Sequence, residues 1–482
     1  MFLVELWERF GFYGMAALMV LFMVQALGYG DAHANLAWGA LSALVYAVPV
    51  LGGWVGDRWI GSRRAMLAGT VVLACGYALL AVAREGHDLL FGALSLVAVG
   101  NGLFKPNAAN LVRRIYDRDP ARIDSAFTMY YMAVNVGSTL SMLATPWVQQ
   151  IWGWHAAFAV CAGGLLFGLL NYACMRRALG TLGSDADHRP LRAPLLLAVV
   201  AGAAVVVLGS TLLLRHVAAA TWCVLLVAAG VAVAWARLTR LCAPRERGGM
   251  IAAAVLTLLV ALFIIFYQQM STSLTLFALR NVEGRMPLPG FGSWRLLPAQ
   301  FQALNAVWIM LLGPLLAWTY ACLARGRGDL SIGGKFALGF AAAAAGFGLI
   351  LGGCRVAEHG MVPGWFLVGG YGLLSLGELL ISGLGLAAMT RYVPARMSGF
   401  VMGSYFALLG AAMYAGSLVA NIARVPAGAL ADAQASLHAY VLLFGRLALL
   451  ALLACALSLA VLPLLRRLVP PSAVGASPGA AS

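Results

Sequence analysis

Residues 5–14 of the chain read ELWERFGFYG, which places Glu5, Glu8 and Arg9 inside an otherwise apolar run at residues 2–27. Such a run is long enough to cross a bilayer as one helix. A charged side chain at bilayer depth costs roughly 2.5 to 3.5 kcal/mol on insertion scales, so three of them facing lipid would offset most of what the apolar residues gain. We therefore expect these side chains to face protein or water inside a helix bundle.

The three charges share one face of the expected helix with Phe12 and Tyr13, because neighbours three and four residues apart lie on the same side. One interpretation is an inert, buried ion pair between Glu5 and Arg9. Two carboxylates against one guanidinium do not balance, however, and the extra carboxylate is expected to bind a proton within reach of physiological pH. This composition is typical of a proton-handling site in a membrane.

The composition indicates a polytopic membrane protein. Of 482 residues, 62% are hydrophobic and only 10% are charged, and apolar runs of about 20 residues follow one another along the chain. The net charge of +15 comes from small groups of arginines between these runs, which favours the positive-inside rule over nucleic-acid binding. The eight cysteines are scattered without a C-x-x-C pair, so we expect neither disulfides nor metal ligation.

Hydropathy windows predict fourteen membrane spans. With the N-terminus in the cytoplasm, most arginines fall in alternate, inner loops, so both termini are expected on the cytoplasmic side. The outer loop at 280–300, with three prolines and three glycines, is expected to be irregular. The predicted spans are 2–27, 36–56, 65–84, 89–112, 125–148, 156–175, 191–214, 219–238, 249–279, 301–324, 335–354, 364–389, 397–422 and 437–465.

The spans divide into six plus six working helices with an inserted pair between them. Residues 191–238 follow a polar segment and carry no charge in the interior of their two spans, whereas polar residues at depth concentrate in the first six and last six spans. The sequence thus predicts an all-α fold. Its expected parts are an N-terminal six-helix bundle at 1–177, a linker with a peripheral helix pair at 178–248, a C-terminal six-helix bundle at 249–468 and a disordered tail at 469–482.

Two further charged residues lie deep in predicted spans. Lys105, one of two lysines in the chain, lies about 16 residues into its span, next to Pro106. Snorkelling to the membrane surface is the alternative to a functional role, although Arg113 and Arg114 already mark the span's end. Glu378 is the only acidic residue at depth in the C-terminal half; its partner is either Arg446 or a cationic ligand.

Uncharged polar residues accompany these charges in other spans. Each of them alone is typical of helix-packing contacts, but together with the charges they are consistent with a polar cavity between two halves. They are Tyr46, Asn135, Gln268, Gln269, Asn305 and Tyr405.

Several chemistries lack candidate residues. Gly333-Gly334-Lys335 lacks the earlier glycine of a phosphate-binding loop and is followed by Phe336, so no ATP site is expected. The histidines fall in loops or near span ends, and neither H-E-x-x-H nor G-x-S-x-G occurs. We therefore expect no catalytic residues, no metal and no cofactor.

Six stretches of the sequence form motifs along the chain: E-x-x-E-R-F-x-F-Y-G at 5–14, G-x-x-x-D-R-x-x-G-x-R-R at 53–64, GNGLFKPN at 100–107, FTMYYMAVNVGS at 127–138, FQALN at 301–305 and GELLIS at 377–382. In this order they resemble the motifs of the proton-dependent oligopeptide transporters, a branch of the major facilitator superfamily. The resemblance covers essentially the whole chain. It is greatest to bacterial dipeptide and tripeptide permeases, which FYQQMSTSL at 266–274 resembles most and whose members also carry an extra helix pair between the halves.

The resemblance implies a proton-coupled symporter that imports di- and tripeptides by alternating access across the bacterial cytoplasmic membrane. It implies the major facilitator fold with twelve core helices and an inserted pair, and we expect a monomer. Proton coupling would fall to Glu5, Glu8, Arg9 and Lys105, and Glu378 would hold the peptide's amino terminus. The other substrate-binding residues implied are Tyr13, Tyr46, Lys105, Asn135, Gln268, Asn305, Ser382 and Tyr405.

Phe12 stands where the family signature has its first tyrosine, and three further positions depart from the family pattern. Ala16 stands where many members have arginine, Gln268 where many have an acidic residue, and Tyr405 where tryptophan is usual. The first two changes keep the charge of the cavity but remove a salt-bridge gate and one anchor for the peptide carboxylate. Lys105 is therefore expected to carry more of the carboxylate binding than in relatives.

One alternative remains open: the substrate could be a modified peptide, a peptide-like drug or a small anion, as the resemblance also allows. A membrane-embedded enzyme would need a nucleophile or metal cluster at depth, and the sequence offers no candidate for one. A signalling receptor would need a sizeable soluble domain or tail, which this sequence does not contain.

Overall fold

The computed structural model describes residues 2–83, 87–116, 123–179, 183–288, 290, 292–326, 331–423, 425 and 432–468. The predicted disordered tail at 469–482 lies outside these residues. Thirteen helices of the described chain are long and apolar enough to cross a membrane. One of them, α5 (Ile123–Leu179), has 57 residues and would be about 85 Å long if it were straight, nearly three bilayer cores. Gly153 breaks it with φ 85° and ψ 177°, so α5 makes two crossings and the described chain has the fourteen that were predicted.

The N-terminal bundle is built from five helical stretches. They are α1 (Phe2–Leu21) with its extension η1 (Phe22–Ala26), α2 (Asp31–Val55) with η2 (Gly56–Ile60), α3 (Ser62–Val82), α4 (His87–Ile115) and the two arms of α5. α1 packs against α5, and α4 packs against α2 and α3. The crossing of α2 and α4 is very close, because a Cβ added at Gly52 would lie 2.1 Å from the carbonyl oxygen of Gly102. Small residues at such crossings let helices approach in a membrane.

The C-terminal bundle repeats this plan with six spans. Its elements are α8 (Pro244–Tyr267), η5 (Gln268–Ser271), α9 (Ser273–Asn281), η6 (Pro298–Gln302), α10 (Ala303–Gly326), α11 (Ile332–Arg355), α12 (Gly364–Tyr392), η7 (Ala395–Met397), α13 (Ser398–Ala420) and α14 (Ala433–Leu468). α11 packs against α12 and α14, and α8 packs against α12 and α13. The predicted span 249–279 is not one continuous helix, because it changes to 3-10 geometry at Gln268 and breaks at Thr272 (φ −121°, ψ −95°).

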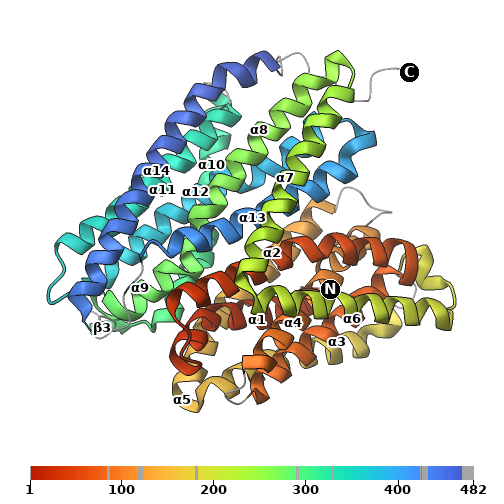
Figure 1. Cartoon of the computed structure of the whole chain (residues 1–482), viewed down its shortest axis with the longest axis horizontal. Coiled ribbons are helices and arrows are strands. Elements are labelled where there is room, and N and C mark those ends of the chain that lie inside the picture. Colours follow the sequence, from red (N-terminus) through yellow and green to blue (C-terminus); the bar gives the residue numbers. More distant parts are fainter. Residues whose placement is uncertain are drawn as a thin grey trace.

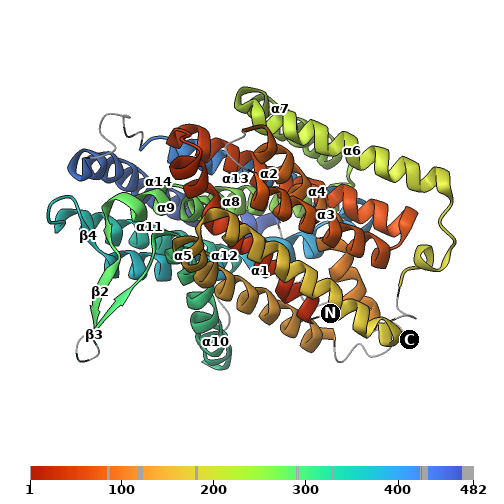
Figure 2. The same cartoon turned by 90° about the horizontal axis from the view of Figure 1, so that it is seen from below.

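The inserted helices α6 (Ala193–Arg215) and α7 (Val217–Leu241) lie on the outside of the molecule, each on a different bundle (Figure 2). α6 packs against α4, where the Thr211 hydroxyl donates to Ser95 Oγ at 3.0 Å. α7 packs against α13, where the Trp235 indole donates to Ser404 Oγ at 2.6 Å. The pair thus spans the two bundles.

The linker before α6 caps the N-terminus of α3. It contains the short helix η4 (Asp185–His188), in which the Asp187 carboxylate accepts the backbone N–H groups of Arg63 and Arg64, both at 3.1 Å. An anionic side chain here satisfies free N–H groups and complements the helix dipole. From residue 183 onward, the polar segment that precedes the inserted pair therefore packs against the start of α3.

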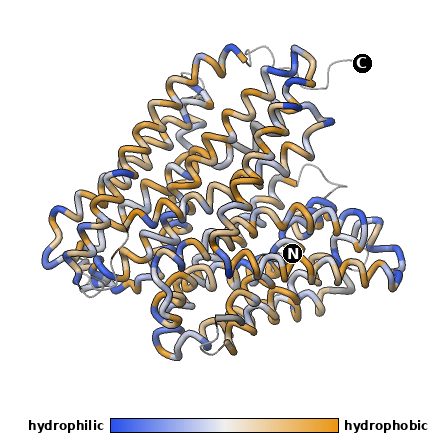
Figure 3. Tube along the Cα trace, in the orientation of Figure 1, coloured by the Kyte–Doolittle hydropathy of each residue, from blue (hydrophilic) through white to orange (hydrophobic). Residues whose placement is uncertain are grey.

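Short strands mark one end of the molecule, which we call the strand end. β1 (Val282–Glu283) pairs in parallel with β4 (Val362–Pro363), and β2 (Arg285–Leu288) forms an antiparallel hairpin with β3 (Gly292–Arg295). The expectation of an irregular connection at 280–300 was wrong for this part. Polar residues gather at helix ends and loops, with apolar residues along the helices between them (Figure 3).

The bundles meet near the strand end and diverge toward the opposite end (Figure 1). At the strand end, both Arg280 Nη atoms pair with the Asp31 carboxylate, one of them at 2.7 Å, and the Asn35 amide donates to Asn421 Oδ1 at 3.0 Å. Gln300 also donates to the Leu143 carbonyl at 2.8 Å. These contacts join the two bundles and close the strand end.

Candidate functional site

The charged face of α1 forms a compact buried cluster. Arg9 Nε lies 2.9 Å from Glu5 Oε1 and 2.6 Å from Glu8 Oε2. The exposed fractions are 2% for Glu5, 0% for Glu8 and 4% for Arg9. Two carboxylates therefore share one guanidinium away from bulk water, as the helical spacing predicted.

Two partners from other helices complete the cluster. The Tyr130 hydroxyl of α5 donates to Glu5 Oε2 at 2.6 Å, and the Asn101 amide of α4 donates to Glu8 Oε1 at 3.2 Å. Neither residue was singled out from the sequence, although both lie in the quoted stretches 100–107 and 127–138. Each carboxylate therefore has one hydrogen-bond donor from a second helix in addition to its contact with Arg9.

A cavity of about 110 Å³ lies beside this cluster, between the two bundles. The N-terminal bundle and the C-terminal bundle both supply its walls, so relative movement of the bundles changes its shape. Its lining residues include Arg9, Tyr13, Ala16, Tyr46 and Lys105 from the first bundle and Tyr267, Gln268, Gln302 and Asn305 from the second. Of the expected substrate-binding residues, Tyr13, Tyr46, Lys105, Gln268 and Asn305 are thus brought together.

Two cationic groups facing the cavity have free donors. Arg9 Nη2 is buried and has no hydrogen-bond partner within the described residues. Lys105 has an exposed side chain in the cavity wall, and its Nζ lies 5.6 Å from the centre of the Tyr46 ring, a cation–π contact. In the described part of the chain Lys105 forms no ion pair with Glu5 or Glu8. Both cations are therefore available to an anionic group in the cavity.

The C-terminal bundle places one carboxylate near the opposite wall. Asn305 donates through Nδ2 to Glu378 Oε2 at 2.8 Å and to Ser375 Oγ at 3.0 Å. Asn305 lines the cavity, and the half-buried Glu378 lies behind it on α12. Arg446 is exposed and forms no ion pair with Glu378 among the described residues, so the structure does not support Arg446 as its partner.

Four expected binding residues do not line this cavity: Glu378, which lies behind Asn305, and three others. The Ser382 hydroxyl donates to the Glu378 carbonyl at 2.8 Å, within its own helix. Asn135 is buried and donates to the Tyr131 carbonyl at 2.9 Å. Tyr405 is 3% exposed and packs edge-on against Phe406. Their roles in binding stay predictions.

Comparisons with known proteins find relatives of this chain in one family. The model of the POT family matches residues 63–435. The dipeptide and tripeptide permease A of Proteus mirabilis is 42% identical over 441 residues, which cover 91% of this chain and 88% of the relative. The permease of the same name from Edwardsiella piscicida is 40% identical over 471 residues, covering 97% and 94%.

Solved structures show the same fold. The crystal structure of tetrameric PepTSo2 has a TM-score of 0.88 and 48% identity, covering 97% of this chain and 98% of that one. A peptide transporter POT in complex with sulfate has a TM-score of 0.84 and 29% identity, covering 97% and 94%. The fold, the order of the motifs and the family match agree: this multi-pass membrane protein belongs to the POT family.

Proposed function

We propose that the chain is a proton-coupled symporter that imports di- and tripeptides by alternating access. The relatives named dipeptide and tripeptide permease support the substrate class. A solved structure that is 48% identical to this chain is that of a proton dependent oligopeptide transporter, which supports the coupling ion.

One observation carries the proposal: two buried carboxylates share the Arg9 guanidinium, while Lys105 faces the cavity without a carboxylate partner in the described chain. When all four groups are ionised, Glu5, Glu8, Arg9 and Lys105 sum to zero charge. Protonation of one glutamate leaves a net charge of +1 beside the cavity. A peptide carboxylate then binds to the free donor of Arg9 and to Lys105.

Glu378 binds the peptide's ammonium group at the other wall, oriented by Asn305. Two or three extended residues span roughly 6 to 10 Å, so a short peptide reaches from one bundle to the other. A longer peptide overshoots this clamp. Departure of the proton to the cytoplasm restores the charge balance of the cluster and releases the carboxylate.

The closed strand end is the extracytoplasmic side, and both termini lie in the cytoplasm of a bacterial cell with the protein in its inner membrane. The arginine distribution of the sequence supports this orientation. The structure is then inward-facing, and the units 1–177 and 249–468 rock about the central cavity with the Asp31–Arg280 pair as an outer latch. Each proton moving inward along the membrane potential releases about 2.3 kcal/mol per 100 mV, which drives uphill peptide import.

Uptake of labelled dialanine into proteoliposomes after a pH jump tests the proposal. Glu8→Gln removes the titrating group while keeping its size, and we expect proton-driven uptake to fall at least about tenfold while peptide exchange without a gradient persists. Glu358→Gln is the matched control, because Glu358 is an exposed carboxylate at the strand end. Full proton-driven uptake by the Glu8 variant would falsify the assignment.

The substrate class needs a separate assay. Competition of dialanine uptake by a panel of dipeptides, tripeptides, tetrapeptides and modified peptides measures the length limit. If a non-peptide anion competes strongly and all dipeptides compete weakly, the transported substrate is a small anion and not a peptide.

A further inference from the structure

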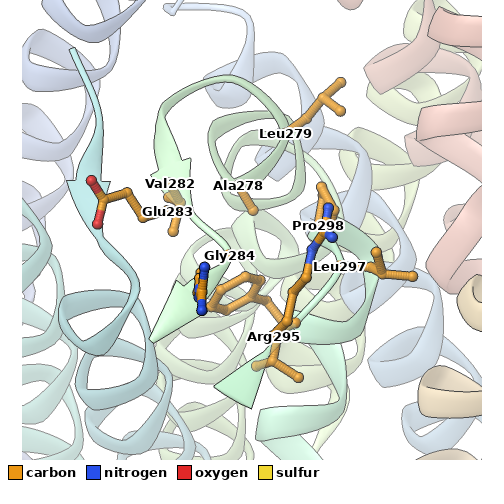
Figure 4. Close-up of a pocket in the computed structure, with 11 residues that line it drawn as sticks. Ala278, Leu279, Val282, Glu283, Gly284, Arg295, Leu297 and Pro298 are labelled. Atoms are coloured by element: carbon orange, nitrogen blue, oxygen red, sulfur yellow. The ribbon is translucent and has the colours of Figure 1, made fainter. Parts of the chain in front are cut away.

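A second, larger cavity lies at the strand end, outside the site between the bundles. Its volume is about 560 Å³, within the range of small-molecule sites, whereas the central cavity has about 110 Å³. Its walls come from the C-terminal bundle: the end of α9, the β2–β3 hairpin and the start of η6. The lining residues include Val282, Glu283, Arg285, Arg295, Pro298 and Phe301 (Figure 4).

The hairpin presents two arginines to this cavity side by side. Arg285 and Arg295 are directly paired across the strands, so their side chains leave the hairpin on the same face. The next pair puts Met286 into the protein core, with an exposed fraction of 0%. Like charges directly opposite each other destabilise a strand pair, so this arrangement has a cost that an anion between the guanidinium groups would remove.

Within the described residues, neither guanidinium group forms an ion pair with a carboxylate. Arg285 Nε donates to the Ser293 hydroxyl at 3.0 Å, and the side chain of Arg295 has no hydrogen-bond partner among those residues. Figure 4 shows the Arg295 side chain extending from β3 toward Pro298, whereas the Glu283 carboxylate points away from Arg295. The lining carries two arginines against one glutamate, so its net charge is positive.

Apart from Glu283, the other side chains that line the cavity are apolar. Phe301, Leu296 and Val282 have exposed fractions of 1%, 4% and 5%. A wall of two cations over an apolar floor matches a small molecule with one oxyanion and a short apolar body. Arginine pairs favour carboxylate and phosphate because their planar forks donate two parallel hydrogen bonds.

We propose that the strand-end cavity is a binding site for a carboxylate- or phosphate-bearing small molecule or headgroup, held by Arg285 and Arg295. The site adjoins the contacts that close the strand end. In η6, Phe301 lines this cavity, and its neighbour Gln300 donates to the Leu143 carbonyl of the first bundle. This site is separate from the central cavity. The proposal for it does not depend on whether the central cavity binds peptide.

Thermal unfolding in a neutral detergent tests this site, with sodium phosphate as the probe and sodium chloride of equal ionic strength as the reference. We expect phosphate to raise the Tm of the wild type by about 1 to 3 °C. Arg285→Gln and Arg295→Gln should each lose at least half of this rise, and the double variant should lose nearly all of it. Arg355→Gln is the matched control, because Arg355 is exposed at the end of α11, outside the cavity lining.

The Tm in chloride shows that each variant is folded, and Arg295→Lys, which keeps the charge, should keep part of the phosphate effect. An equal rise in the wild type and the double variant would overturn the proposal. Two further experiments identify the molecule that carries the oxyanion. If dialanine raises the Tm but its C-terminal amide does not, and if Arg295→Gln loses this rise, the site binds peptide carboxylates. Stabilisation by phosphatidylglycerol over phosphatidylcholine nanodiscs, lost in the double variant, assigns it to a lipid headgroup.

Discussion

The two bundles hold the acids near the central cavity in different ways. In the first bundle Glu5 and Glu8 share the Arg9 guanidinium at 2.9 and 2.6 Å, whereas in the second bundle Glu378 is held by the neutral Asn305 amide at 2.8 Å. When one of two carboxylates that share a guanidinium binds a proton, the net charge of the cluster becomes more positive and the guanidinium is freed for another anion. A carboxylate that is held by a neutral amide has no cation to release. The first bundle is therefore built as a switch and the second as an anchor.

Arg9→Gln should have the largest effect, because it leaves two buried carboxylates without their cation. Removing one partner of a buried ion pair costs roughly 3 to 5 kcal/mol, so proton-driven dialanine uptake should fall at least about 100-fold. The Arg9→Gln, Glu8→Gln double variant should recover Tm but not coupled uptake. A single variant with more than a tenth of wild-type uptake contradicts the role of the shared guanidinium.

Glu378→Gln tests the anchor. A hydrogen bond to a charged group contributes roughly 1.5 to 3 kcal/mol, so the KM for dialanine should rise about 10-fold or more. Inhibition by N-acetylated dialanine, which lacks the ammonium group, should be unchanged. If both ligands weaken by the same factor, Glu378 does not recognise the amino terminus.

Lys105→Gln tests recognition of the other end of the peptide, its carboxylate. We expect the KM for dialanine to rise about 10-fold, because one of two carboxylate donors is lost, and the affinity for dialanine amide to stay the same. Lys335→Gln is the control, since it removes the other lysine, which lies over the Tyr320 ring at 4.3 Å and outside the cavity lining. Equal loss for peptide and amide would show that Lys105 does not bind the carboxylate.

Asp31→Asn should have the smallest effect, because the Asp31–Arg280 pair lies partly exposed at the strand end. Its loss should destabilise the state with a closed strand end by about 1 kcal/mol or less, a two- to fivefold shift in population. Distances between spin labels at positions 30 and 356, on a cysteine-free background, measure that shift. An unchanged distance distribution rules out the latch.

The fold was largely predictable because a bilayer demands long apolar helices, and these are visible as runs in the sequence. The break at Thr272 was missed, because no proline or glycine interrupts residues 265–275 to signal it. Gly153 was expected in a loop between two spans, but its position there did not predict its positive φ, which makes the break in α5.

The site was predictable where it depends on helical spacing. Glu5, Glu8 and Arg9 fall on one face by their spacing alone, and the structure shows that face buried. Tyr130 and Asn101 were missed because their contacts join residues 125 and 93 positions apart. Ser382 lies only four residues after Glu378, yet its hydroxyl bonds within the helix, which periodicity does not determine.

Simultaneous measurement of peptide and proton movement tests the switch most directly. Proteoliposomes loaded with a pH-sensitive dye report internal acidification while labelled dialanine enters. Wild-type protein should acidify the lumen in proportion to peptide uptake, whereas Glu8→Gln should exchange peptide without acidification. Acidification by the Glu8 variant in the same proportion as wild type would contradict the assignment of proton coupling to the cluster around Arg9.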